Sequence, residues 1–215
     1  HHAYNATYRS HDRLELENIC INLADAYRQK GELVQASKYY RKALWVVDSL
    51  KSEYVKFSIY MGLAQTYADL HNFTLAHRYF DLAEQVPEQR LEYENYHFLN
   101  SKGNCLYYEE KYAEALPYFQ QAYQVVKPFN QPSFNALVEA NLGEIYMLLG
   151  KHDSAHYYLD KSCSVLMNDS TANEEVLFYL NSLQGALALR ENKLEAANRY
   201  LSKPYNPQRI GPSYI

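Results

Sequence analysis

The sequence predicts an all-α fold, a solenoid of antiparallel helix pairs, and three observations lead to this prediction. Seven glycines and seven prolines in 215 residues are about half of average usage, too few turn-forming residues for a sandwich or a barrel. The chain repeats itself with a period near 40 residues, which indicates stacked helical units. The 23 tyrosines suit a thin architecture, in which a ring packs on one side while its hydroxyl reaches water.

Five segments stack in register without a gap, and each is expected to form one helix pair: residues 22–43, 62–83, 101–122, 141–162 and 183–204. In each, a small residue is followed twelve residues later by an alanine and four residues after that by a bulky residue. Such small and large side chains alternate where two helices approach closely. The small residues are Ala24, Ala64, Gly103, Gly143 and Gly185, the alanines Ala36, Ala76, Ala115, Ala155 and Ala197, and the bulky residues Tyr40, Phe80, Phe119, Leu159 and Leu201.

A short polar turn is expected between the two helices of each pair. Glycine or asparagine there can adopt the positive φ that ends a helix, which His71 and Glu110 suit poorly. Spacings of 40, 39, 40 and 42 residues between the small positions predict longer helices than in a repeat of about 34 residues. The turns fall at Gly31, His71–Asn72, Glu110–Lys111, Gly150 and Asn192.

The predicted organisation is one solenoid domain with a partial repeat at each end. Residues 1–10 align with the tail of a preceding second helix, and residues 209–215 with the start of a further first helix. A solenoid needs polar capping repeats, so we interpret the chain as a fragment of a longer array; alternatively, His1 and His2 are tag remnants and the protein starts there. The five repeats are expected at residues 11–50, 51–89, 90–129, 130–170 and 171–208.

This register resembles the tetratricopeptide repeat, whose signature is Leu-Gly, a tyrosine three residues on, then alanine and aromatic positions. The match is strongest in the first, second and fourth repeats, at Leu23–Ala24 with Tyr27, Leu63–Ala64 with Tyr67, and Leu142–Gly143 with Tyr146. The third and fifth repeats depart from it, with Lys102, Leu106, Gln184 and Ala188 at the leucine and tyrosine positions. The resemblance covers nearly the whole chain and implies a right-handed superhelix, as in the long-helix variants of bacterial signalling and regulatory proteins.

Charge and hydropathy exclude several classes of partner. The 21 basic and 25 acidic residues are spread without long single-sign runs, so we expect no direct binding of nucleic acid. No apolar stretch approaches the roughly 20 residues that cross a bilayer, and no signal-peptide pattern opens the chain. We therefore expect no membrane contact and a cytoplasmic location, with a periplasmic or other extracytoplasmic one left open for a fragment.

No pattern indicates catalysis, a cofactor or a metal. Serines are scattered without a GxSxG turn, and Cys20, Cys105 and Cys163 lack metal or redox spacing. His152 and His156 could share one helix face, but a third ligand and the glutamate of a metalloprotease helix are missing. We interpret both as solvated residues at a helix start, and we expect a non-enzyme without cofactor or metal.

The resemblance implies that the first helices line a concave groove, exposing positions 2, 5, 9, 12 and 13 of each repeat. In the first two repeats this lining is polar, and in the fourth and fifth it is largely apolar. The candidate peptide-binding residues are Asn18, Asp25, Arg28, Gln65, Asp69, His97, Asn100, Asn104, Tyr107, Tyr108, Glu144, Met147 and Arg190.

Asn100 and Asn104 are one helical turn apart, and their amides could pair with the N–H and C=O of an extended peptide. This is similar to the asparagines with which tetratricopeptide domains hold peptide backbones; the alternative is ordinary solvated polarity. The apolar lining of the fourth and fifth repeats could equally pack against flanking repeats. Arg28 and Arg190 lie at opposite ends of the lining, so a carboxylate clamp is not expected.

The predicted function is a non-catalytic scaffold module that binds a protein or peptide in this groove. The alternative is a ligand- or peptide-sensing domain of a larger signal-transduction protein or transcription regulator.

Overall fold

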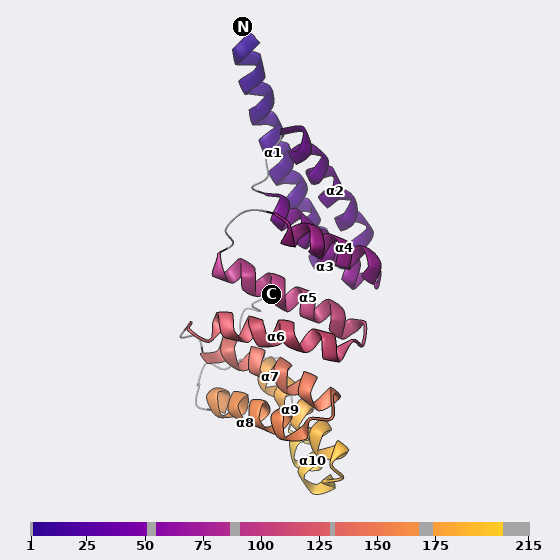
Figure 1. Cartoon of the computed structure of the whole chain (residues 1–215), viewed down its shortest axis with the longest axis vertical. Helices are drawn as coiled ribbons and strands as arrows, with labels where there is room; N and C mark the ends of the chain where they lie inside the picture. Colours follow the sequence, from indigo (N-terminus) through magenta and orange to yellow (C-terminus); the bar gives the residue numbers. More distant parts are fainter. Residues whose placement is uncertain (1, 51–54, 87–90, 130–131, 168–173, 204–215) are drawn as a thin grey trace. The chain divides into compact units, whose positions relative to one another are not determined.

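A computed structural model describes residues 2–50, 55–86, 91–129, 132–167 and 174–203, which form helices and turns with no strand among them. The helices pack in consecutive antiparallel pairs, which confirms the all-α prediction (Figure 1). None of the described helices has the length and hydropathy that crossing a bilayer requires. The helices are α1 (His2–Gln29), α2 (Leu33–Leu50), α3 (Lys56–Asp69), α4 (Phe73–Glu84), α5 (Glu92–Tyr108), α6 (Tyr112–Val126), α7 (Pro132–Leu148), α8 (His152–Met167), α9 (Glu174–Arg190) and α10 (Leu194–Leu201).

The chain divides into two compact units, each described here by itself. Unit 1 comprises His1–Leu91 and Asn104–Glu110, and unit 2 comprises Glu92–Gly103 and Lys111–Ile215. In unit 1, α1 to α4 pack in sequence and α1 also contacts α3. In unit 2, α6 to α10 pack in sequence and α7 also contacts α9. A first helix therefore touches the next first helix as well as its own partner.

The start of α1 differs from the sequence alignment. Alignment of residues 1–10 with a second helix predicts a break before the first repeat, but α1 continues unbroken from His2 to Gln29. The reason is local, because the first 30 residues contain no glycine or proline that would interrupt a helix. The further repeat expected at residues 209–215 lies outside the described residues.

The five predicted turns share one backbone conformation. Gly31 and Gly150 have φ of 76° and 71°, and Asn192 has φ of 58°. His71 and Glu110, which suit the conformation poorly as residue types, adopt it too, with φ of 55° and 62°. The helix-pair geometry therefore imposes a left-handed backbone conformation at this position, whatever the residue type.

Close approach between helices explains the small positions of the repeat. In unit 2, a Cβ added at Gly143 would lie 2.7 Å from the Leu159 side chain, and one at Gly103 would lie 3.2 Å from the Phe119 ring. Both contacts join the small and bulky positions of a single repeat. In unit 1, Tyr40 lies where a Cβ on Gly62 of the next repeat would meet it, at 2.4 Å. The bulky position thus fills space within its own repeat and, at Tyr40, toward the next.

The two polar departures from the leucine position are buried. Lys102 is 8% exposed, and its Nζ lies 5.5 Å and 5.4 Å from the ring centroids of Phe98 and Tyr118. Gln184 is 7% exposed, and its Nε2 donates a hydrogen bond of 3.3 Å to Asp160. Cation–π contacts and a hydrogen bond replace aliphatic packing at these positions.

Stacked tyrosine pairs recur inside three repeats. The ring centroids are 5.4 Å apart in the first repeat, 5.6 Å in the second and 5.5 Å in the fourth, with interplanar angles of 13°, 1° and 9°. In every case one tyrosine comes from the first helix and the other from the second, and the three pairs account for six of the 23 tyrosines. The pairs are Tyr27–Tyr39, Tyr67–Tyr79 and Tyr146–Tyr158.

Candidate functional site

In unit 1, three of the candidate residues form one charged group on α1 and α3. The Arg28 Nη1 lies 3.9 Å from the Asp69 Oδ2, and both side chains are partly exposed. Asp25 accepts a hydrogen bond from the hydroxyl of Tyr40. Burial, reinforced by this hydrogen bond, raises the pKa of Tyr40 far above its usual range. Partial burial also raises the pKa of Asp69, against the opposing effect of Arg28.

The other candidates of unit 1 are more loosely arranged. Asn18 is exposed on α1, and Gln65 is half-buried on α3. In the last part of α5, Asn104 is half-buried, and the rings of Tyr107 and Tyr108 meet edge to face at 5.5 Å and 79°. Tyr108 is 55% exposed, which makes it the more accessible of the two candidate tyrosines.

In unit 2, a partly buried hydrogen bond joins α7 and α9. The Tyr179 hydroxyl donates to the Glu144 Oε2 at 2.5 Å, and the Asn141 Oδ1 lies 3.3 Å from the same hydroxyl. Neither Tyr179 nor Asn141 is among the candidates. Tyr179 occupies position 2 of the fifth repeat, which is one of the positions expected to line the groove. The sequence therefore contained a signal for it.

The remaining candidates of unit 2 have different surroundings. His97 is exposed, with its ring centroid 6.2 Å and 5.3 Å from those of Tyr93 and Tyr96. Arg190 is exposed at the end of α9. The Oδ1 of Asn100 is buried and has no hydrogen-bond partner in the part of the chain that the structure describes.

Met147 does not lie on an exposed lining, contrary to its place in the candidate set. It is 4% exposed and belongs to the core cluster formed by α7, α8 and α9. The physical reason is that α7 is packed by α6, α8 and α9, so little of its circumference stays open. Met147 is therefore a packing residue of unit 2.

The histidines of the second helices have carboxylate partners and are not merely solvated. In unit 2, the His156 Nε2 lies 3.0 Å and the His152 Nδ1 3.7 Å from the Glu191 Oε1. In unit 1, the His77 Nε2 lies 2.8 Å from the Glu109 Oε2. Among the described side chains, no group of three or more His, Cys, Asp or Glu residues could hold a metal ion.

An ionic cluster around a buried carboxylate in unit 2 was not predicted from the sequence. The Lys161 Nζ lies 2.8 Å from the Glu139 Oε1, and the Tyr123 hydroxyl donates to the same oxygen at 3.0 Å. The Glu139 side chain is 4% exposed. Burial alone would lower the pKa of Lys161, but the hydrogen bonds to Glu139 and Tyr123 outweigh it and raise that pKa. The available signal was Glu139, one of two acids in the otherwise largely apolar helix α7.

Comparison with protein families identifies the repeat. Two family models, both described as tetratricopeptide repeat, match residues 96–168 and 19–53. Modules of this kind are typically non-catalytic. No curated protein matches the sequence.

Several solved structures share the fold. A signal transduction ATPase with numerous domains from Pyrococcus horikoshii, which has a tetratricopeptide repeat sensor, is 22% identical with a TM-score of 0.71. The match covers 84% of this chain but only 28% of the ATPase. BtubC from P. vanneervenii is 20% identical, covers 100% of this chain and 92% of its own, and has a TM-score of 0.74. YrrB, described as having an unusual peptide-binding site, is 20% identical over 84% of this chain and 80% of its own, with a TM-score of 0.52.

Proposed function

Because the chain contains a tetratricopeptide repeat domain, generally a protein-interaction module, we propose that it is a non-catalytic scaffold that binds a protein or peptide. The binding surface in this proposal is the face formed by the first helices of each unit. This face carries the candidate residues other than Met147. Protein and peptide ligands suit it because it offers hydrogen-bonding side chains without a recognisable catalytic group.

The observation that carries the proposal is the lateral contact between successive first helices. In unit 1 the pair of Arg28 and Asp69 joins α1 to α3, and in unit 2 the bond from Tyr179 to Glu144 joins α7 to α9. Lining positions from different repeats are therefore neighbours within each unit. An extended ligand could contact several of them at once.

The asparagines of α5 are the proposed backbone-holding residues. Asn100 and Asn104 are four residues apart on this helix, about 6 Å along its axis. The buried Asn100 Oδ1 lacks a hydrogen-bond partner among the described residues, and a buried acceptor without a donor is costly. A ligand N–H that reached this oxygen would remove this cost. Tyr108 is the exposed aromatic anchor nearby in sequence.

The test is a double substitution, Asn100→Ala with Asn104→Ala, titrated by calorimetry against a partner isolated with the parent protein. Loss of two side-chain hydrogen bonds of about 0.5–1.5 kcal/mol each predicts a complex about 5- to 150-fold weaker. Stability should change little, since both residues are only half-buried. Asn22→Ala, an exposed asparagine on α1, is the matched control. Equal affinities for parent and double variant would remove α5 from the binding surface.

A second candidate function is sensing within a longer protein. It is favoured by the likeness to the ATPase from Pyrococcus horikoshii, whose tetratricopeptide repeat domain is described as a sensor. In that case a ligand should change the shape of the domain, whereas a scaffold should keep it. Small-angle X-ray scattering with and without the isolated partner separates the two, and an unchanged radius of gyration would favour the scaffold.

A further inference from the structure

Unit 2 contains a pocket whose lining residues all belong to its second helices. Its volume is about 320 Å³, and it is lined by Pro117, Gln120, Gln121, Tyr123 and Gln124 of α6 and by Tyr158 of α8. A volume of this size is at the small end of the range for ligand sites. None of the lining side chains carries a charge, so the pocket offers amides, phenols and apolar surface only.

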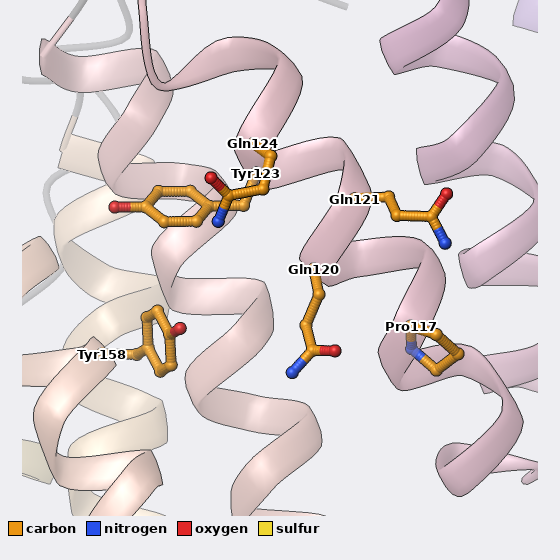
Figure 2. Close-up of a pocket in the computed structure, with 6 residues that line it drawn as sticks. All are labelled: Pro117, Gln120, Gln121, Tyr123, Gln124 and Tyr158. Carbon is orange, nitrogen blue, oxygen red and sulfur yellow. The ribbon is translucent and has the colours of Figure 1, made fainter.

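Part of the pocket is held in place by the fold. The Gln120 Nε2 donates a hydrogen bond of 2.8 Å to the Tyr146 hydroxyl, which leaves the Oε1 as an acceptor. The Tyr123 hydroxyl is fixed by Glu139 and Lys161, and its ring meets that of Tyr158 at 90° with centroids 6.1 Å apart. Figure 2 shows these two rings close together on one side of the pocket. A ligand would therefore meet a preorganised wall.

The other polar groups are free to bind. The amides of Gln121 and Gln124 and the hydroxyl of Tyr158 make no hydrogen bond with the residues that the structure describes. Pro117 has no N–H and lies inside α6, so the carbonyl of Ala113 lacks its usual helical donor. The pocket thus presents unused donors and unused acceptors side by side.

The spacing of the amides matches an extended polypeptide. Gln120 and Gln124 are four residues apart on α6, which places them about 6 Å apart along the helix axis. Backbone groups on one edge of an extended chain recur every two residues, at about 6.6 Å. One glutamine amide can donate to a carbonyl and accept from an N–H. Two of them at this spacing can therefore follow one edge of the chain.

We propose that this pocket binds an extended, uncharged polypeptide segment through Gln120 and Gln124, with one small apolar side chain placed against Tyr158. The chemistry of the pocket disfavours two other occupants. A polyproline segment has no N–H to offer the free acceptors. A sugar would need an open aromatic face, but Tyr123 is 6% exposed and one face of Tyr158 is covered by Tyr146.

The experiment is a titration of the ¹⁵N-labelled full chain, followed through glutamine side-chain amide resonances. The probe is an acetylated and amidated pentapeptide of alternating serine and valine, compared with capped pentaproline and with maltose. We expect saturable shifts at Gln120 and Gln124 with the serine–valine peptide alone. Gln120→Ala with Gln124→Ala should weaken its binding at least about fivefold, and Gln35→Ala, an exposed glutamine on α2, should not.

Three outcomes would overturn the proposal: no saturable shift at these amides up to millimolar peptide, equal affinity in the double variant, or equal binding of pentaproline or maltose. Far-UV circular dichroism of the double variant shows whether it is folded. If it is not, the single variant Gln124→Ala, which removes an exposed amide without a described partner, provides the same comparison. The α5 variant Asn100→Ala with Asn104→Ala should leave the peptide shifts unchanged, so this test is independent of the first-helix face.

Discussion

Unit 1 and unit 2 each contain a carboxylate–cation pair, and the two pairs differ mainly in the burial of the carboxylate. In unit 1 the Arg28 and Asp69 side chains are 33% and 41% exposed, with the charged atoms 3.9 Å apart. In unit 2 the Glu139 side chain is 4% exposed and lies 2.8 Å from the Lys161 Nζ, with Tyr123 as a third member. The two cations are similarly exposed, at 33% for Arg28 and 37% for Lys161. The units therefore differ in the carboxylate, which is partly exposed in unit 1 and buried in unit 2.

The difference indicates where each pair contributes. An exposed pair is screened by solvent and salt and is worth little to stability. Its value is that both charges remain accessible to a partner. Removing one member of a buried pair leaves an uncompensated charge, which is strongly destabilising. We therefore assign Arg28 and Asp69 to recognition, and Glu139 and Lys161 to holding α6, α7 and α8 together.

The largest effect is expected for Lys161→Met. It leaves Glu139 buried without its cation and should lower the free energy of unfolding by about 3 kcal/mol, measured by urea denaturation. The pKa of Lys161 is raised by the fold, so its stabilising contribution is complete below the ordinary lysine pKa and is lost only as the pH rises through the raised value. The loss in the variant should thus be the same at pH 6 and pH 9.

A second substitution sharpens this prediction. Combining Lys161→Met with Glu139→Leu removes both charges and should restore most of the stability, because apolar residues can replace a buried pair at little cost. Tyr123 then keeps its packing but loses its acceptor. A double variant as unstable as the single one would show that shape, and not the unpaired charge, is responsible.

A much smaller effect is expected for Arg28→Ala. Loss of an exposed pair should cost at most about 1 kcal/mol, and the difference from the parent should shrink between low and high sodium chloride, since salt screens the pair. Thermal unfolding at two salt concentrations measures it. If this variant lost as much stability as Lys161→Met, the contrast between the two units would disappear.

The smallest effect is expected at the turn beside the exposed pair. His71→Gly relieves the positive φ of 55°, and should stabilise unit 1 by about 0.5 kcal/mol once the greater freedom of glycine in the unfolded chain is counted. Glu110→Gly relieves a φ of 62° without lying beside Asp69 in sequence, so it is the matched control. Similar gains in urea denaturation indicate a backbone effect; a gain at Glu110 only would show that His71 supports the charge of Asp69.

The helix pairs and turns could be predicted from the sequence because close packing limits the residues allowed there. Gly143 must be small because Leu159 occupies the space of its missing side chain, and the same constraint recurs at Gly103 and Gly185. The start of α1 could not be predicted in the same way. Residues 2–10 resemble the corresponding part of a repeat, but they contain no residue that would end a helix. Alignment by period cannot detect a turn that is missing.

The candidate site was less predictable, because surface positions carry no comparable constraint. Met147 occupies a lining position by count, but the covering of α7 on several sides buries it. The tyrosine stacks had a readable signal, a tyrosine in each helix twelve residues apart, as at Tyr146 and Tyr158. The cluster of Glu139, Lys161 and Tyr123 joins three helices, and no pattern within a single helix predicts such a contact.

The aromatic arrangement has a consequence for spectroscopy. Trp45 is the single tryptophan of the chain and is 66% exposed on α2. Its emission should therefore resemble that of an indole in water and should change little on unfolding. The stacked tyrosine rings, in contrast, are close enough for their transitions to couple. Near-ultraviolet dichroism in the tyrosine band should therefore follow the packing of the helix pairs. Tryptophan fluorescence should respond mainly to a molecule that binds to α2 near Trp45.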